Sequence, residues 1–141
     1  MCTGLFEKQG EYLDYYKELF KEHINKIMIC TNPDLIVDRG DKRELCAGSV
    51  ALVFKKMGGK VTYFGKPFSE VYNQSIDNKE KKVLSIGDNL NTDIKGANLL
   101  NYDSLLISNG VHKNEIKTEG IDLVSKKYEV IVNFIQTEFK W

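Results

Sequence analysis

The hydrophobic side chains switch between helical and extended spacing along the chain. Apolar residues that recur every three to four positions are typical of amphipathic helices, and short uninterrupted apolar runs between Gly, Pro, Asn or Asp are typical of buried strands. This pattern predicts helices over about 11–25, 47–56, 67–76, 94–100 and 126–139, strands over 26–30, 61–64, 82–86 and 103–107, and a polar turn over 38–41. Strands that alternate with helices through short loops indicate an α/β fold with parallel strand pairs.

One internal boundary is expected. Gly65, Lys66 and Pro67 interrupt the pattern directly after the strand expected at 61–64, and the sequence contains neither a low-complexity linker nor an internal repeat. We therefore expect two parts, formed by residues 1–64 and 65–141.

Composition narrows the class of protein. The chain has 141 residues, 42% of them hydrophobic and 28% charged, with a formal net charge of zero. This is enough apolar material for a core, and the balanced charge argues against electrostatic binding to nucleic acid or to a membrane surface. Three cysteines without a C-x-x-C motif indicate reduced thiols, and no apolar run is long enough to span a bilayer. We expect a cytoplasmic protein.

Spacing excludes several kinds of catalytic site. With histidine only at positions 23 and 112, no H-E-x-x-H zinc motif can form. The glycine positions also exclude the G-x-G-x-x-G dinucleotide fingerprint, the G-x-S-x-G nucleophile elbow and the P-loop. Chemistry based on carboxylates and lysine remains open.

Three charged residues follow predicted strands and are candidates for such chemistry. Asp88 comes directly after the strand at 82–86, Asp93 begins the next helix, and Lys66 follows the strand at 61–64. Because ligands of parallel sheets bind beyond the carboxyl ends of the strands, these side chains could bind Mg²⁺ and a phosphoryl group together. Simpler interpretations remain open: Asp93 as a helix cap, Asp88 as a turn residue and Lys66 as a surface lysine.

Other candidate residues have simple structural interpretations. Asn32 and Asp34 flank Pro33 in what reads as an ordinary turn. His112, at an expected helix start, is interpreted as a solvated side chain.

The order of these motifs resembles the haloacid-dehalogenase-like (HAD) hydrolases, and within them the class IIA capped phosphatases. The resemblance extends along most of the chain. It rests on Cys-Thr-Asn-Pro-Asp at 30–34, Cys-Ala-Gly at 46–48, Phe-Gly-Lys-Pro at 64–67, Ile-Gly-Asp-Asn-Leu-Asn-Thr-Asp-Ile-Lys-Gly-Ala at 86–97 and Asn-Gly-Val-His at 109–112.

The resemblance implies a fold and a set of roles. Residues 1–64 would be the C-terminal part of an α/β cap domain, and residues 65–141 the C-terminal half of a Rossmann-like HAD core. Lys66 and Asp88 would be catalytic, and Asp88 and Asp93 would hold Mg²⁺. The substrate, a phosphate ester, would be bound by a set made up of Asn32, Asp34, Lys66 and Asn89.

One family motif is absent from these 141 residues. HAD phosphatases attack phosphate with the first aspartate of a D-x-D motif, whereas no two aspartates here are two positions apart; they lie at 14, 34, 38, 41, 77, 88, 93, 103 and 122. In the family this motif precedes the cap. The resemblance therefore implies a truncated enzyme that is inactive unless a separate N-terminal fragment supplies the nucleophile.

Two other functions remain open. The chain could be a non-catalytic module that associates with itself or with another protein through an exposed sheet edge. It could also be a simple phosphate or nucleotide binder.

Overall fold

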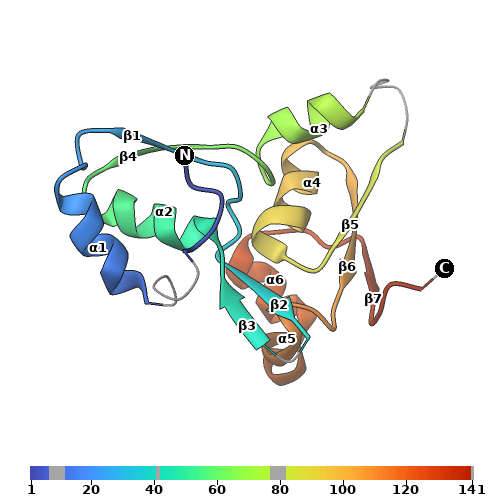
Figure 1. The fold of residues 1–141 in the computed structure, drawn as a ribbon. Coiled ribbons are helices and arrows are strands. Elements are labelled where there is room, and N and C mark those ends of the chain that lie inside the picture. The colour runs from blue at the N-terminus through green and yellow to red at the C-terminus, as the bar shows by residue number, and fades with distance from the viewer. Residues whose placement is uncertain (7–11, 41, 77–81, 141) are drawn as a thin grey trace. The chain divides into compact units, whose positions relative to one another are not determined.

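A computed structural model describes residues 1–6, 12–40, 42–76 and 82–140 of the chain (Figure 1). Two compact units are present, Met1–Gly65, called unit 1, and Lys66–Trp141, called unit 2. Both contain parallel strand pairs with flanking helices. The α/β fold class predicted from the sequence is therefore confirmed, while the assignment of unit 1 to a cap domain stays a prediction.

Unit 1 combines a parallel strand pair with two helices and a hairpin. Its elements are α1 (Leu13–Lys21), β1 (Ile27–Cys30), β2 (Ile36–Arg39), β3 (Lys42–Leu45), α2 (Ala47–Lys56) and β4 (Lys60–Tyr63). β1 and β4 pair in parallel, with Ile27 opposite Lys60 and Cys30 opposite Tyr63. β2 and β3 form a separate antiparallel hairpin.

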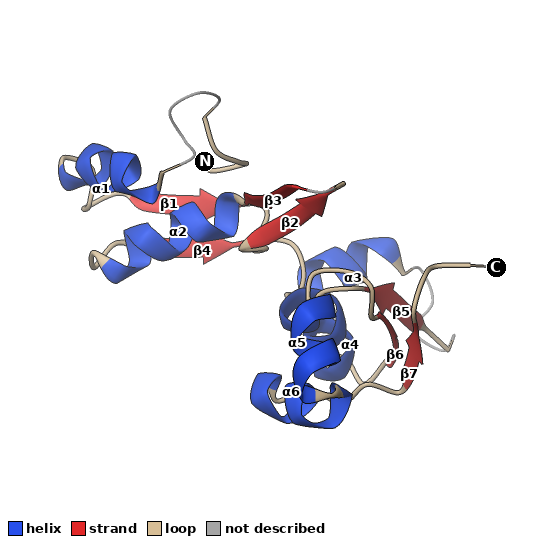
Figure 2. Cartoon of the chain, turned by 90° about the horizontal axis from the view of Figure 1, so that it is seen from below, coloured by secondary structure: helices blue, strands red, loops and turns tan. Residues whose placement is uncertain are grey.

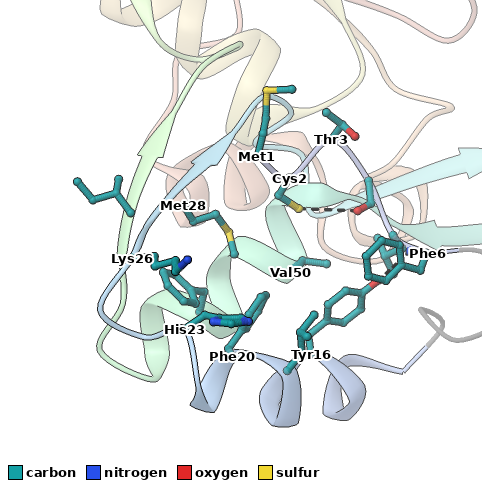
Figure 3. A pocket seen from close by; sticks show the side chains of 15 residues that line it. Met1, Cys2, Thr3, Phe6, Tyr16, Phe20, His23, Lys26, Met28 and Val50 are labelled. Carbon is teal, nitrogen blue, oxygen red and sulfur yellow. Dashed lines mark hydrogen bonds between the residues drawn. The ribbon is translucent and has the colours of Figure 1, made fainter.

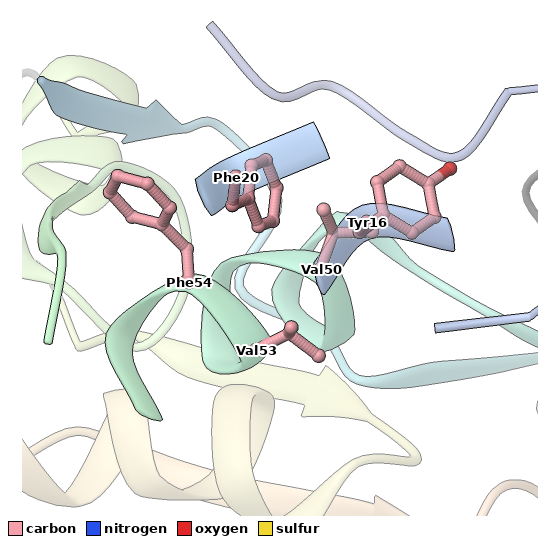
Figure 4. Close-up of a cluster of buried hydrophobic side chains, with 5 residues drawn as sticks. All are labelled: Tyr16, Phe20, Val50, Val53 and Phe54. Atoms are coloured by element: carbon pink, nitrogen blue, oxygen red, sulfur yellow. The ribbon is translucent and has the colours of Figure 1, made fainter. Parts of the chain in front are cut away.

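The core of unit 1 lies between its two helices (Figure 4). It consists of the buried side chains of Tyr16, Phe20, Val50, Val53 and Phe54. The rings of Phe20 and Phe54 meet edge to face, with centroids 4.9 Å apart. Burying aromatic rings of this size stabilises a small unit strongly, at roughly 25 cal/mol for each Å² of apolar surface.

Unit 2 is a three-stranded parallel sheet flanked by helices. Its elements are α3 (Ser69–Ser75), β5 (Leu84–Gly87), a π-helical turn (Leu90–Ile94), α4 (Lys95–Leu99), β6 (Asp103–Ile107), α5 (Lys113–Glu119), α6 (Ile121–Tyr128) and β7 (Phe134–Gln136). The strand order is β5-β6-β7. In Figure 2, α4, α5 and α6 gather on one side of the three strands.

The two faces of this sheet differ in exposure. Leu106 points toward the helices and packs with Leu90, Ile94, Val124 and Val130 in a buried cluster. The register partners Ile86, Leu105 and Phe134 lie on the opposite face, where Ile86 is 37% and Phe134 is 56% exposed. Unit 2 therefore has one covered face and one open apolar face, among the residues described.

The last predicted helix, at 126–139, is wrong. α6 ends at Tyr128, because Glu129 adopts a left-handed conformation with φ of 55°. Farther along the chain, Phe134–Gln136 form β7, which extends the sheet beside β6. Residues 130–135 are rich in β-branched and aromatic side chains, which suit a pleated surface, and pairing with β6 outweighs their helix-like spacing. The sequence pattern indicated a helix start at His112 but gave no extent for α5.

The polar turn predicted at 38–41 is only partly right. Asp38 lies in β2, where it pairs with Arg43 of β3 through hydrogen bonds of 2.7 and 2.9 Å. The chain does turn at Gly40, which has a φ of +60°, and Asp41 lies outside the described residues. The short hairpin has few apolar residues, so hydrophobic periodicity could not reveal it.

Across the described parts of both units, no helix combines the length and the apolar character that crossing a membrane requires.

Candidate active site

Lys66, Asp88 and Asp93 all belong to unit 2, where Asp88 and Asp93 follow one strand. β5 ends at Gly87, Asp88 comes next, and Asp93 lies in the π-helical turn that leads into α4. Lys66 precedes α3 and is joined to Pro67 by a cis peptide bond. Because the strands are parallel, this edge of the sheet also receives the loop after β6.

Lys66 and Asp93 form an ion pair. The Lys66 ammonium lies 2.5 Å from Oδ1 of Asp93, and the backbone N–H of Asn89 donates to Oδ2 of the same carboxylate at 3.1 Å. Asp93 is only 4% exposed, whereas the Lys66 side chain is 46% exposed. The two hydrogen bonds compensate the buried charge, and the pair fixes the lysine at the sheet edge while leaving it accessible.

Asp88 is oriented by the loop after β6. The backbone N–H of Val111 donates to its Oδ2 at 3.0 Å. Gly110 packs so closely against this carboxylate that a Cβ at position 110 would overlap it. Gly87 is under the same restriction, because a Cβ there would overlap the Asp93 carboxylate. Both glycines are therefore required by the close approach of an acidic side chain.

The donor set suits a magnesium ion in part. Among the residues described, no three or more His, Cys, Asp or Glu side chains cluster in a way that could hold a metal. Mg²⁺ is commonly held by one or two carboxylates together with waters and phosphate oxygens, however. Asp88 fits this role, because Val111 engages only one of its two carboxylate oxygens. Both oxygens of Asp93 already accept hydrogen bonds.

A cavity opens beside Asp88. It has a volume of about 380 Å³, within the size range of small-molecule sites, and is lined by Ile86, Gly87, Asp88, Ile107, Gly110 and Phe139. Its walls are apolar apart from the carboxylate. A polar group bound there would therefore meet Asp88 on an otherwise hydrophobic surface.

Unit 1 has a cavity of similar size, about 410 Å³, which is shown in Figure 3. It is lined by aromatic and aliphatic side chains such as Phe6, Tyr16 and Phe20, with His23 and Lys26 among them. None of its lining residues is an aspartate or a glutamate. The cavity beside Asp88 is therefore the better candidate for chemistry on a metal and a phosphate.

Comparison with known proteins agrees with this geometry. The model of the HAD-hydrolase-like family matches residues 63–131, which include Lys66, Asp88 and Asp93. A haloacid-dehalogenase-like hydrolase from Brucella suis 1330 is 36% identical, with a TM-score of 0.70, over 77% of this chain and 44% of that protein. Residues 63–131 of the chain therefore resemble the HAD-like hydrolases. A search of curated proteins finds no match.

Two further solved structures share the HAD fold with this chain. A p-nitrophenyl phosphatase from Archaeoglobus fulgidus is 19% identical, with a TM-score of 0.63, over 96% of this chain and 52% of that protein. A glycerol phosphate phosphatase from Mycobacterium tuberculosis, in complex with magnesium, is 19% identical, with a TM-score of 0.57, over 93% of this chain and 39% of that protein. The chain spans about half the length of these HAD proteins, or less.

The remaining predicted site residues have local structural partners. Asn89 is 7% exposed, and its side-chain oxygen accepts the N–H of Asn91 at 3.0 Å, which caps the π-helical turn. Asn32 and Asp34 belong to unit 1, where the N–H of Asp34 donates to the Asn32 side chain at 3.1 Å. Their roles in substrate binding, like the metal role of Asp93, stay predictions.

The structure also places residues near this candidate site that the sequence pattern did not indicate. Tyr72 of α3 lies with its hydroxyl against Gly96; burial, and then the negative charge of Asp93, raise its pKa. His112 is 6% exposed, so its interpretation as a solvated side chain is wrong. The amide of Val111 had no sequence signal at all, because a backbone N–H is common to nearly every residue type.

Proposed function

We propose that this chain provides the lysine and metal-binding half of a class IIA HAD phosphatase that acts on phosphate esters with Mg²⁺. The observation that carries this proposal is the arrangement after β5 and β6: an accessible Lys66 held by Asp93, and Asp88 oriented into a cavity by Val111. The family match over 63–131 and the magnesium complex of a similar phosphatase support it.

Each residue has a defined task in this proposal. Lys66, as a cation, binds a phosphoryl oxygen and offsets negative charge in the transition state. The buried carboxylate of Asp93 keeps the Lys66 ammonium at the sheet edge and prevents the lysine side chain from extending into solvent. Asp88 would hold the magnesium ion, which when bound neutralises charge on the phosphoryl group.

The chain alone is expected to bind without turning over. None of its 141 residues forms a D-x-D motif, so no side chain is in place for the covalent step of this family. We propose that a separate segment with that motif completes the site. The purified chain with Mg²⁺ should leave p-nitrophenyl phosphate intact. Robust hydrolysis that persists in Asp88→Ala would contradict the proposal.

Metal binding provides a direct test that does not require turnover. Calorimetric titration with Mg²⁺ should detect binding to the chain, and Asp88→Asn should weaken it at least about tenfold, because the substitution removes the ligand charge. Asp103→Asn is the matched control, since Asp103 is an exposed carboxylate at the start of β6 in the same unit. Equal losses in both variants would argue against a site at Asp88.

A second function, association through unit 2, is favoured by the open face of its sheet. Leu84 is 47% exposed and Phe134 is 56% exposed, and β5 forms the edge of the described sheet. Exposed apolar faces and unpaired strand edges favour association. We propose a second copy of this chain as the partner, because a formal net charge of zero creates no overall repulsion between copies.

Sedimentation velocity tests this second function. The chain should form a dimer at micromolar concentration, and Leu84→Lys should shift it toward the monomer. Leu123→Lys is the control, because Leu123 is 59% exposed on α6, away from the open face. A strictly monomeric wild-type chain would exclude self-association.

We also propose a cytoplasmic location. Cys2, Cys30 and Cys46 are present as free thiols. Burial raises the pKa of each thiol, which keeps it protonated and poorly reactive. Such thiols suit a reducing compartment.

A further inference from the structure

Glu115 of α5 is the centre of a hydrogen-bond network in unit 2. Its Oε2 accepts hydrogen bonds from His112 Nδ1 and from the Tyr128 hydroxyl, each at 2.9 Å, and its Oε1 lies 2.6 Å from the Lys127 ammonium. The hydrogen bond from His112, followed by the one from Lys127, lowers the pKa of Glu115 to about 2. The side chain is therefore a carboxylate near neutral pH.

The network fixes the orientation of His112. The imidazole is 6% exposed and meets the Tyr128 ring edge to face, with centroids 4.7 Å apart. Its Nε2 is buried without a hydrogen-bond partner in the described part of the chain. A buried N–H without an acceptor is costly, so the ring proton is assigned to Nδ1, where Glu115 accepts it. Glu115 thus determines both the position and the tautomer of this ring.

His112 is directly bonded to the residue that orients Asp88. The segment 110–112 runs from Gly110, packed against the Asp88 carboxylate, through the Val111 amide that donates to it, to the ring held by Glu115. The carbonyl of Gly110 also accepts the N–H of Lys113 at 3.0 Å. The loop is therefore held at one end by the Asp88 carboxylate and at the other by the Glu115 network.

We infer that Glu115 is a positioning residue for Asp88. By holding His112, Glu115 keeps the Val111 N–H directed at Oδ2 of Asp88 and leaves the other carboxylate oxygen available to a cation. This inference rests on the proposed magnesium role of Asp88. Groups that orient metal ligands indirectly commonly change metal affinity when they are removed.

The chain offers a closely matched pair of variants to test this. Glu115→Gln keeps the size of the side chain but removes the charge that attracts three donors. Glu119→Gln makes the same change one turn later on α5, where the carboxylate lies 4.0 Å from the Lys127 ammonium. Tyr128→Phe removes a single donor to Glu115 and provides a milder variant.

Two measurements distinguish positioning from simple stability. Amide hydrogen exchange of Val111, followed by NMR, reports on the hydrogen bond to Asp88. It should become about tenfold faster in Glu115→Gln relative to the amides of β6, and should change less in Tyr128→Phe. The Mg²⁺ dissociation constant should rise about three- to tenfold in Glu115→Gln. Glu119→Gln should leave both values unchanged.

The outcomes separate this inference from the proposed function. If the wild-type chain does not bind Mg²⁺, the magnesium role of Asp88 fails, while the exchange rate of Val111 still decides whether Glu115 holds the loop. Unchanged Val111 exchange in a folded Glu115→Gln chain would overturn the inference, as would faster exchange with unchanged Mg²⁺ affinity. If Glu115→Gln does not fold, unchanged Val111 exchange in Tyr128→Phe overturns it.

Discussion

Unit 1 buries mainly aromatic and aliphatic side chains, whereas unit 2 also buries several polar ones. In unit 1 the buried cluster is built from rings and branched side chains, and Ser49 is its one buried polar residue in the described part. The buried polar residues of unit 2 gather largely around the ends of its strands: Asn89, Thr92, Asp93, Ser104 and His112.

This difference indicates that burial in unit 1 serves stability, whereas the buried polar groups of unit 2 also serve its candidate chemistry. Apolar burial stabilises a fold without directional requirements, so the aromatic core of unit 1 serves mainly to hold its helices together. A buried polar group must find hydrogen-bond partners, as Asp93 does with Lys66 and Asn89. In unit 2, satisfying those partners also orients the groups that could bind a metal and a phosphate.

The largest expected effect is on the core of unit 1. Phe54→Ala removes a ring that is 2% exposed and packs against Phe20, so the free energy of unfolding should fall by about 3–4 kcal/mol. Denaturant unfolding followed by circular dichroism measures this, with Tyr12→Ala, at a residue 75% exposed, as the control. A loss below 1 kcal/mol would mean that the cluster contributes little.

The second-largest expected effect on stability is at Gly110 in unit 2. The added Cβ of Gly110→Ala overlaps Asp88, so the loop must shift. We expect the free energy of unfolding to fall by about 2 kcal/mol and the Mg²⁺ affinity to fall about tenfold. Gly4→Ala is the control, because a Cβ there meets no atom within 4 Å. Thermal unfolding and Mg²⁺ calorimetry provide the two readouts. Unchanged Mg²⁺ affinity would place the metal elsewhere.

Breaking the ion pair at Lys66 should have a smaller effect. Lys66→Met removes the ammonium from Oδ1 of the buried Asp93 carboxylate and leaves the hydrogen bond from the Asn89 amide to Oδ2, so the free energy of unfolding should fall by about 1–2 kcal/mol. The effect is limited because the lysine side chain is 46% exposed. Lys117→Met on α5, also at an exposed lysine, should be neutral in the same denaturant titration.

The smallest expected effect is a pH dependence that originates at Glu115. Its pKa is lowered from 4.5 to about 2, so its contribution to stability is complete above about pH 4.5 and is lost as pH falls toward 2. The stability difference between wild type and Glu115→Gln should therefore shrink by about 1 kcal/mol over that range. Urea unfolding at several pH values measures it, and a constant difference would contradict this assignment.

Local patterns predicted part of the fold well. α2 and β6 have the bounds predicted for them, because an apolar periodicity and clear glycine or asparagine stops agree at both places. The predicted C-terminal helix failed where neighbouring structure decides: residues 134–136 form a strand because β6 offers an unpaired edge beside them. The β2–β3 hairpin was missed because its side chains are mostly polar.

Part of the candidate site, like part of the fold, could be predicted from the sequence. Lys66, Asp88 and Asp93 could be identified from residue type and from their positions after strands, and the structure brings Lys66 and Asp93 into contact. The partners of Asp88 could not be identified in this way. The amide of Val111 and the carboxylate of Glu115 become relevant only when the loop after β6 folds back toward β5.

By itself, the sequence determined the α/β class and the three charged residues of the site, because apolar periodicity and residue chemistry are local properties. The tertiary structure alone decided how those residues are held. Hydrogen bonds such as the one from Val111 to Asp88 join positions 23 residues apart, and their geometry depends on which strands become neighbours. That choice is made by the packing of the whole unit, because burial on one face of the sheet and strand pairing must be satisfied together.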